Sequence, residues 1–273
     1  MKLITKMITI AGLAAALVSC SDKAAKNEDF KYLVDEFADL KIMRYQVPGW
    51  DDLSLQQKKY VYHLAEAAKH GRDIIWMQNC KYNLDIRRVV ENILENYTGD
   101  RTCQEWAQFE EYAKRLFFSN GIHHHYSADK FVPGFSPEFF KQALLAVDAA
   151  KLPLAEGQTI EALCDEVFPA IFDPAVMAKR VNQADGEDLV LTSASYYYDG
   201  VTQKEAEDFY AKMKNPNDTM PVMFGMNSRL VKENGKIQEK VWKSGGLYGQ
   251  AIDKIIYWLE KAQGVAENDK QKA

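Results

Sequence analysis

Amphipathic helical periodicity over residues 54–119 constrains the fold of this chain more than any other sequence feature. Apolar residues recur there every three or four positions, which is typical of helices that bury one face. Ser54 is a favourable N-cap, and Asn120-Gly121 suits a helix end because glycine adopts positive φ readily. Predicted helices span residues 30–40, 54–78, 83–96, 104–119, 158–168, 174–183, 203–214 and 248–262, and another begins at Ser136-Pro137-Glu138.

Predicted strands follow from β-branched and aromatic content and from one turn signal. Asn234-Gly235 favours a two-residue hairpin turn because both residue types tolerate positive φ. Since no clean linker interrupts residues 28–263, we expect one α+β body, mainly helical, with helices packed on a small antiparallel sheet. The predicted strands span residues 41–47, 188–198, 221–232 and 236–243.

The N-terminus has the pattern of a secretory signal peptide. Lys2 and Lys6 precede an apolar run of about a dozen residues, which is too short to cross a bilayer as a helix. Leu17-Val18-Ser19-Cys20 resembles the cleavage site of bacterial lipoproteins, which implies lipid attachment at Cys20. We therefore expect a signal peptide over residues 1–19, a polar tether over 20–27, and a lipid-anchored protein of the cell envelope, on the outer membrane. The alternative is an ordinary signal peptide with an incidental cysteine.

Composition favours a folded domain and excludes some partners. Apolar residues make up 47% of the 273 residues and aromatic residues 12%, enough for a sizeable core. The net charge of −5 argues against nucleic-acid binding, which needs a basic surface. Beyond Cys20 the cysteines are Cys80, Cys103 and Cys164, with no C-x-x-C pair, so neither a disulfide framework nor a zinc knuckle is predicted. We favour buried free thiols, with pairing of two of them in an exported protein as the alternative.

Histidine spacing does not fit a catalytic zinc site. A helical zinc site needs two histidines on one face with a glutamate beside them, and no such string occurs. Three histidines stand together in a loop closed by Pro133-Gly134, where we favour local hydrogen bonding over a metal site and keep substrate contact as a third possibility. The five histidines are His63, His70, His123, His124 and His125.

Three segments carry a resemblance to a known family. The first segment spans residues 120–133 and is followed by Pro137-Glu138-Phe139-Phe140. It contains Gly121 and Lys130-Phe131-Val132-Pro133, at the spacing that this family shows. Ser195–Thr202 leads into Glu205–Tyr210, and Gly246–Ile252 forms the third segment. Together they resemble the N-terminal region of dipeptidyl peptidase III, a family of metallopeptidases, over most of residues 28–268.

This resemblance implies a two-lobed, zinc-dependent enzyme that releases dipeptides from peptide N-termini. Its zinc ligands lie in His-Glu-x-x-x-His and a later acidic motif, which do not occur before Ala273. Residues 28–273 would then be a truncated N-terminal lobe, with a barrel-like β-core wrapped in helices, and zinc would be bound outside this chain. We expect no catalytic or metal-binding residue here, an inactive segment when alone, and a peptide substrate and a C-terminal catalytic lobe as partners. The resemblance also makes the loop a candidate wall of the cleft, through His123, His124, His125, Tyr126 and Lys130.

A second hypothesis belongs to a different class of function. The chain would be a non-enzymatic envelope lipoprotein that binds peptides or a protein partner through its helical surface. The two hypotheses differ in whether a zinc-binding lobe completes the protein.

Overall fold

The computed structural model describes residues 30–220 and 222–273. The predicted signal peptide, the lipid-anchor residue Cys20 and the tether therefore lie outside the described residues. The described residues divide into two compact units at Val47 and Pro48, and each unit is described by itself.

The first unit contains a β-hairpin where a helix is predicted. Strand β1 (Leu33–Phe37) pairs antiparallel with β2 (Leu40–Met43), and Ala38 adopts positive φ in the turn. Burial alternates along β1 with a period of two residues. The helix prediction for residues 30–40 is wrong because the apolar residues fit both periods, and cross-strand pairing decides between them.

In the second unit, local start signals correctly predict most helices. Ser54 begins α1 with a capping box to Gln57, and Ser136 caps α5 with Pro137 in its first turn. The predicted helix over residues 54–78 is divided at Gly71. The helices are α1 (Leu55–His70), α2 (Arg72–Asn79), α3 (Asn83–Asn96), α4 (Gln104–Ser119), α5 (Pro137–Leu145), α6 (Ile160–Phe172), α7 (Leu189–Thr192), α8 (Gln203–Ala211), α9 (Gly249–Gly264) and α10 (Asp269–Lys272), with a 3₁₀ turn at Ala149–Lys151.

Two further predictions are wrong. Residues 174–183 form no helix, because backbone groups at Lys179 and Arg180 bond to neighbouring segments instead. Residues 188–198 form no long strand: the Asp188 carboxylate accepts hydrogen bonds from Val190 N and Leu191 N and begins the short helix α7. Only Tyr198–Asp199 becomes strand β3.

The predicted hairpin at Asn234-Gly235 is confirmed. Strands β4 (Ser228–Glu233) and β5 (Lys236–Val241) pair antiparallel, and both turn residues have positive φ. Strand β3 adds to β4 in parallel, so this sheet is mixed rather than antiparallel. The fold is mainly helical (46%) and of the mixed α+β class, and this class was predicted from the sequence. The described residues form small sheets and no closed barrel.

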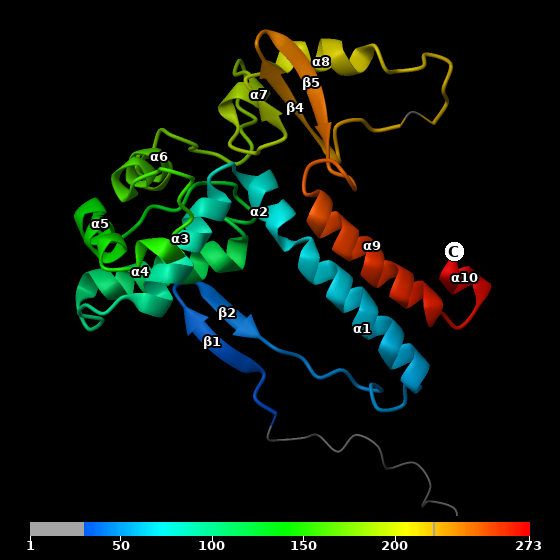
Figure 1. The fold of residues 1–273 in the computed structure, drawn as a ribbon, viewed down its shortest axis with the longest axis horizontal. Coiled ribbons are helices and arrows are strands. Elements are labelled where there is room, and N and C mark those ends of the chain that lie inside the picture. The colour runs from blue at the N-terminus through cyan, green and yellow to red at the C-terminus, as the bar shows by residue number, and fades with distance from the viewer. Residues whose placement is uncertain (1–29, 221) are drawn as a thin grey trace, which may run out of the picture. The chain divides into compact units, whose positions relative to one another are not determined.

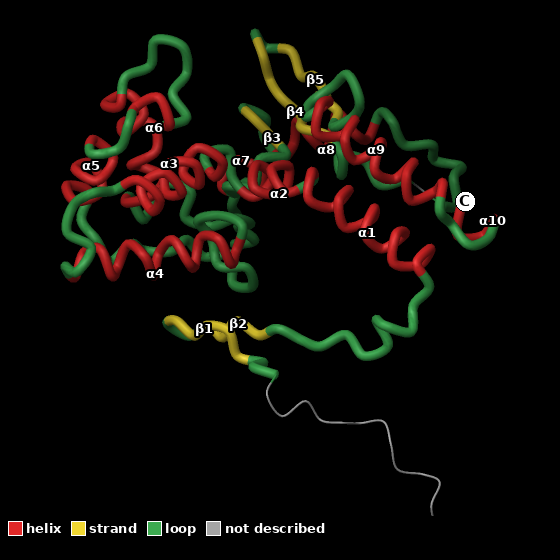
Figure 2. The backbone as a smooth tube through the Cα atoms, turned by 60° about the horizontal axis from the view of Figure 1, so that its bottom comes forward, coloured by secondary structure: helices red, strands yellow, loops and turns green. Residues whose placement is uncertain are grey.

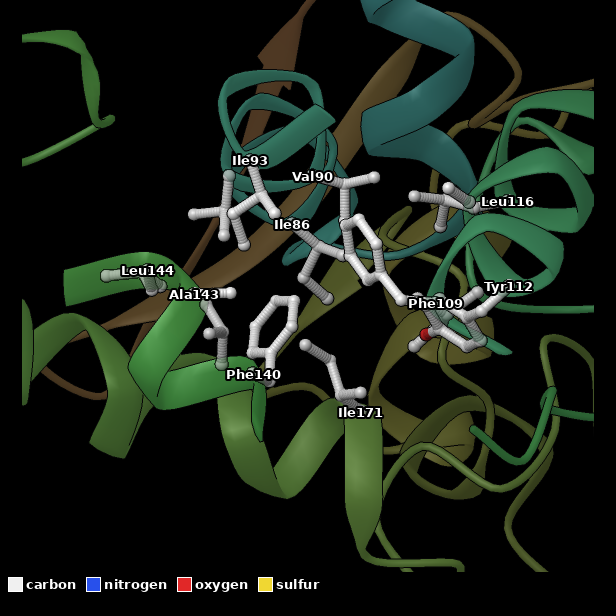
Figure 3. Close-up of a cluster of buried hydrophobic side chains, with 14 of the residues drawn as sticks. Ile86, Val90, Ile93, Phe109, Tyr112, Leu116, Phe140, Ala143, Leu144 and Ile171 are labelled. Atoms are coloured by element: carbon white, nitrogen blue, oxygen red, sulfur yellow. The ribbon is translucent and has the colours of Figure 1, made fainter. Parts of the chain in front are cut away.

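Helices α2 to α6 enclose the main core. Figure 3 shows side chains from α3, α4, α5 and α6 converging on one apolar cluster. A smaller cluster lies between α8 and the mixed sheet. Helices α1 and α9 lie along each other (Figures 1 and 2). Among residues 30–220 and 222–273, no helix has both the length and the apolar content needed to cross a membrane.

Candidate functional site

The loop that carries the three histidines is fixed at its first residues. Asn120 takes the left-handed conformation at the end of α4, and Gly121 follows with φ +146°. Asn83 is buried, and its Oδ1 accepts a hydrogen bond from Ile122 N at 3.2 Å. The same side chain donates from Nδ2 to Trp76 O at 3.0 Å, so one asparagine joins the loop to the end of α2.

Backbone pairing holds the rest of this loop in place. His124 N donates to Asp129 O at 2.8 Å, and Phe131 N donates to Ile122 O at 2.9 Å. The returning segment bonds to residues 178–180, through Lys130 N to Ala178 O and Arg180 N to Ala128 O. The loop is therefore an ordered, irregular pairing of three chain segments.

His123 is a buried structural residue in this arrangement. Its side chain is 2% exposed, and Nε2 lies 2.7 Å from Met177 O. Because a carbonyl accepts, Nε2 carries the proton and Nδ1 does not. Nδ1 is buried and has no hydrogen-bond partner within the described part of the chain. This geometry favours the neutral imidazole.

His124 and His125 have different partners from His123. His124 Nδ1 accepts hydrogen bonds from Tyr126 N and Ser127 N at 3.2 and 3.1 Å, which stabilises the turn. The His125 ring stacks on that of His124 at 4.5 Å, and its carbonyl accepts from Arg180. Tyr126 is 86% exposed. This local bonding agrees with the favoured interpretation of the histidine loop.

Lys130 binds backbone carbonyl groups at the end of α6. Its Nζ donates to Asp173 O and, at 2.6 Å, to Val176 O. A cation there compensates the negative end of the helix dipole. Burial lowers the pKa of Lys130. Lys130 therefore stabilises the structure, while the prediction that this loop lines a cleft stays a prediction.

These side chains do not fit a zinc ion. A zinc site needs several nitrogen, sulfur or carboxylate ligands converging on one point. One imidazole nitrogen of His123 and one of His124 are committed to backbone groups, in different directions. Across residues 30–220 and 222–273, no three His, Cys, Asp or Glu side chains gather into a metal-binding group. The expectation that zinc is bound outside this chain stays a prediction.

Protonation of His123 should make stability depend on pH. Burial lowers the pKa of His123 to about 4, with Arg180 and Lys130 adding to the effect, while the Met177 bond and Asp129 oppose it. In the unfolded chain a histidine titrates near pH 6.5. As the pH falls from about 6.5 to about 4, the unfolded chain binds the proton first, so the native state loses up to about 3 kcal/mol of stability.

We expect His123→Gln to reduce this acid dependence, because an amide can donate to Met177 O but does not titrate. The measurement is the free energy of unfolding from urea titrations at pH 7, 5.5 and 4.5. His70→Gln on α1 is the control and should keep the wild-type dependence. Equal pH dependence of the unfolding free energy in His123→Gln and wild type would contradict the conclusion that His123 causes this acid dependence.

A second cluster, which we call the Arg229 cluster, was not predicted from the sequence. It comprises Met77 on α2, Tyr196, Asp199, Arg229 on β4, and Tyr248 before α9. The guanidinium carbon of Arg229 lies 4.1 Å from the Tyr196 ring centroid. Both Arg229 Nη1 and the Tyr248 hydroxyl approach Met77 Sδ, at 3.8 and 3.1 Å.

The charge of Arg229 is not balanced locally. Its Nε is buried without a hydrogen-bond partner, and no carboxylate among the described residues pairs with it. Asp199 instead accepts from the Tyr196 hydroxyl at 2.9 Å. Burial raises the pKa of Tyr248 to about 12, so that hydroxyl stays a neutral donor. A cation that lies over one tyrosine ring and shares a methionine neighbour with a second tyrosine suits a carboxylate ligand.

Two residues of the Arg229 cluster lie in segments that the sequence already singles out, but only the fold shows that these residues are close together. Tyr196 belongs to Ser195–Thr202 and Tyr248 to Gly246–Ile252, two of the segments that resemble dipeptidyl peptidase III. Their side chains are joined in space through Met77 of α2 and Arg229 of β4. Neither Met77 nor Arg229 lies in a recognisable motif.

Comparison with known protein families and curated proteins assigns this chain to no family. No model of a known protein family and no curated protein matches this sequence. The resemblance to dipeptidyl peptidase III therefore depends on the sequence motifs and stays a prediction.

Proposed function

We propose that this chain is the N-terminal lobe of a lipid-anchored, zinc-dependent dipeptidyl peptidase of the III type. It supplies part of the wall that holds the peptide, while a C-terminal catalytic lobe holds the zinc. The observation that carries the proposal is the Arg229 cluster, where two of the family-like segments meet around an unpaired guanidinium.

The chemistry of this cluster suits a peptide. A guanidinium binds a carboxylate through two parallel hydrogen bonds, and partial burial strengthens them by excluding water. Tyrosine rings add apolar contact area, and the Tyr248 hydroxyl adds a neutral donor. A short peptide with an acidic group can contact the guanidinium, the tyrosine rings and the Tyr248 hydroxyl together.

An exposed apolar face supports a second lobe as partner. Helices α1 and α9 expose several large apolar side chains along their length, which is unusual for a surface that faces only water. A catalytic lobe packed on this face would bury them. The exposed residues are Leu55, Val61, Tyr62, Leu64, Ile256, Tyr257 and Leu259.

A peptide-binding assay tests the role of Arg229. We expect tetra-alanine with a free carboxylate to bind the chain about 10- to 100-fold more tightly than its amide, because a hydrogen bond to a charged group contributes about 1.5–3 kcal/mol. Arg229→Gln should abolish the difference, measured by isothermal titration. Arg101→Gln is the matched control, since Arg101 also lies over an aromatic ring, that of Trp106 at 4.6 Å.

Two outcomes would contradict the proposal. Equal affinity for acid and amide in the wild type would remove the peptide-carboxylate role. Release of dipeptides by this chain alone with added zinc would contradict the placement of the chemistry in another lobe. An extended chain that binds peptides but never cleaves them would favour the non-enzymatic lipoprotein.

A further inference from the structure

We propose that a cation-lined pocket between α2 and α9 binds a phosphate-bearing anion. The pocket, which we call the α2–α9 pocket, has a volume of about 330 Å³ and lies where the first turn of α9 meets the bend between α1 and α2 (Figure 1). At that bend, an added Cβ on Gly71 would lie 3.9 Å from Ile255 Cδ1 of α9, so the helices are in direct contact there. The lining residues that matter for binding are Lys69, Arg72, Asp73, Tyr248, Gln250 and Lys254.

The α2–α9 pocket carries positive charge that the protein itself does not neutralise, although the whole chain has a net charge of −5. Lys69 is already paired with a glutamate of α1 at 2.5 Å. The carboxylate in the lining, Asp73, lies 3.0 Å from Arg87 but 4.0 Å from Arg72. Lys254 forms no ion pair within the described part of the chain. Arg72 and Lys254 therefore keep their charges available for a ligand.

Backbone donors add to these two side chains. The N-cap positions of α2 and α9 are Gly71 and Tyr248, and neither supplies a side-chain hydrogen bond to the first turn of its helix. First-turn residues of both helices, Arg72 in α2 and Gln250 in α9, line the pocket. The first N–H groups of a helix have no partner within the helix and favour a negative charge beside them. The side-chain cations and both helix starts thus act on the same space.

The number and arrangement of these donors favour a phosphate group over a single carboxylate. A phosphomonoester carries about −1.5 to −2 charges at neutral pH, which matches Arg72 and Lys254 together, whereas a carboxylate carries one. The guanidinium fork of Arg72 can pair with two phosphate oxygens, and the ammonium group of Lys254 acts as a point charge on a third. The volume is near the lower end of the range for ligand pockets, about 300–1,000 Å³, so we expect a small phosphorylated group.

This site is distinct from the Arg229 cluster and does not depend on the peptidase proposal. Tyr248 contributes to both, but its hydroxyl donates to Met77 Sδ at 3.1 Å, within the Arg229 cluster. Arg229 itself does not line the α2–α9 pocket. The two sites can therefore be separated by substitution.

Isothermal titration of the full chain with inorganic pyrophosphate at low ionic strength tests the site. We expect one equivalent to bind, and Arg72→Gln or Lys254→Gln to weaken binding by about 10- to 100-fold, the usual contribution of a hydrogen bond to a charged group. Lys254→Arg should retain binding. The matched control is Lys261→Gln, which removes the same charge from α9 at a residue that lies over the Tyr257 ring, and it should leave the affinity unchanged. Arg229→Gln should also bind pyrophosphate as the wild type does.

Vesicles of phosphatidylcholine with and without phosphatidic acid identify the source of the phosphate. Sedimentation that needs phosphatidic acid, is lost in Lys254→Gln and is reversed by pyrophosphate would assign the pocket to a lipid headgroup. Pyrophosphate binding without such sedimentation would assign it to a soluble phosphate compound. The site would be overturned by absence of pyrophosphate binding, by equal losses in Lys254→Gln and Lys261→Gln, or by tighter binding of tetra-glutamate than of pyrophosphate.

Discussion

Replacing Phe109 by alanine is expected to lower the free energy of unfolding by about 3–5 kcal/mol. Phe109 lies on α4, is completely buried, and its ring contacts those of Trp106, Phe135, Phe139 and Phe140. Truncation removes the centre of this aromatic cluster, which the close-packed neighbours cannot refill. The measurement is the midpoint of urea unfolding followed by far-ultraviolet circular dichroism.

Two matched variants separate cavity formation from a general effect of substitution. Val132→Ala, at a residue that is 81% exposed in the histidine loop, should change stability by less than about 0.5 kcal/mol. Phe109→Leu keeps most of the volume and should cost clearly less than Phe109→Ala. If Phe109→Ala unfolded at the wild-type urea concentration, the core of α3 to α6 would not be packed as described.

The sequence predicted those elements whose signals are local. Ser54 and Ser136 each cap a helix at the expected residue, because their hydroxyls accept hydrogen bonds from backbone N–H groups three residues away. The same applies to the turn at Asn234-Gly235. Such signals need no knowledge of the rest of the chain.

Predictions failed where distant partners decide the conformation. Arg180 bonds to Ala128 and Ser195, so residues 174–183 cannot keep their backbone groups for a helix. The sequence predicts that a strand begins at Asp188, yet the carboxylate of this residue caps α7 and also accepts a hydrogen bond from Gln203 N. Propensity alone could not distinguish these cases.

The candidate site shows the same limit. Three adjacent histidines predicted a polar loop, but the burial of His123 follows from Met177, which is 54 residues away. Arg229 and Tyr248 are 152 and 171 residues away from Met77 in sequence, and no motif spacing connects them. Residues that function through long-range contacts become visible only when the fold brings them together.

The contact between Gly121 and Asn83 provides the sharpest test of how the histidine loop is attached. Gly121 has φ +146°, and an added Cβ would lie 2.1 Å from Asn83 Nδ2 and 2.8 Å from its Cγ. Gly121→Ala should therefore cost about 2–6 kcal/mol, the sum of backbone strain and overpacking. Gly157→Ala is the control, because Gly157 also has positive φ but nothing lies within 4 Å of its added Cβ; it should show the strain alone.

A double-mutant cycle then identifies the clash itself. Asn83→Ala leaves Ile122 N without its acceptor and should cost about 1–3 kcal/mol. It also removes the side-chain atoms that the new Cβ of Gly121→Ala would meet. The double variant should therefore be more stable than the sum of the single effects predicts, by about 1–3 kcal/mol. Strict additivity in urea unfolding would mean that the loop reaches α3 by another contact, and the anchoring role of Asn83 would be wrong.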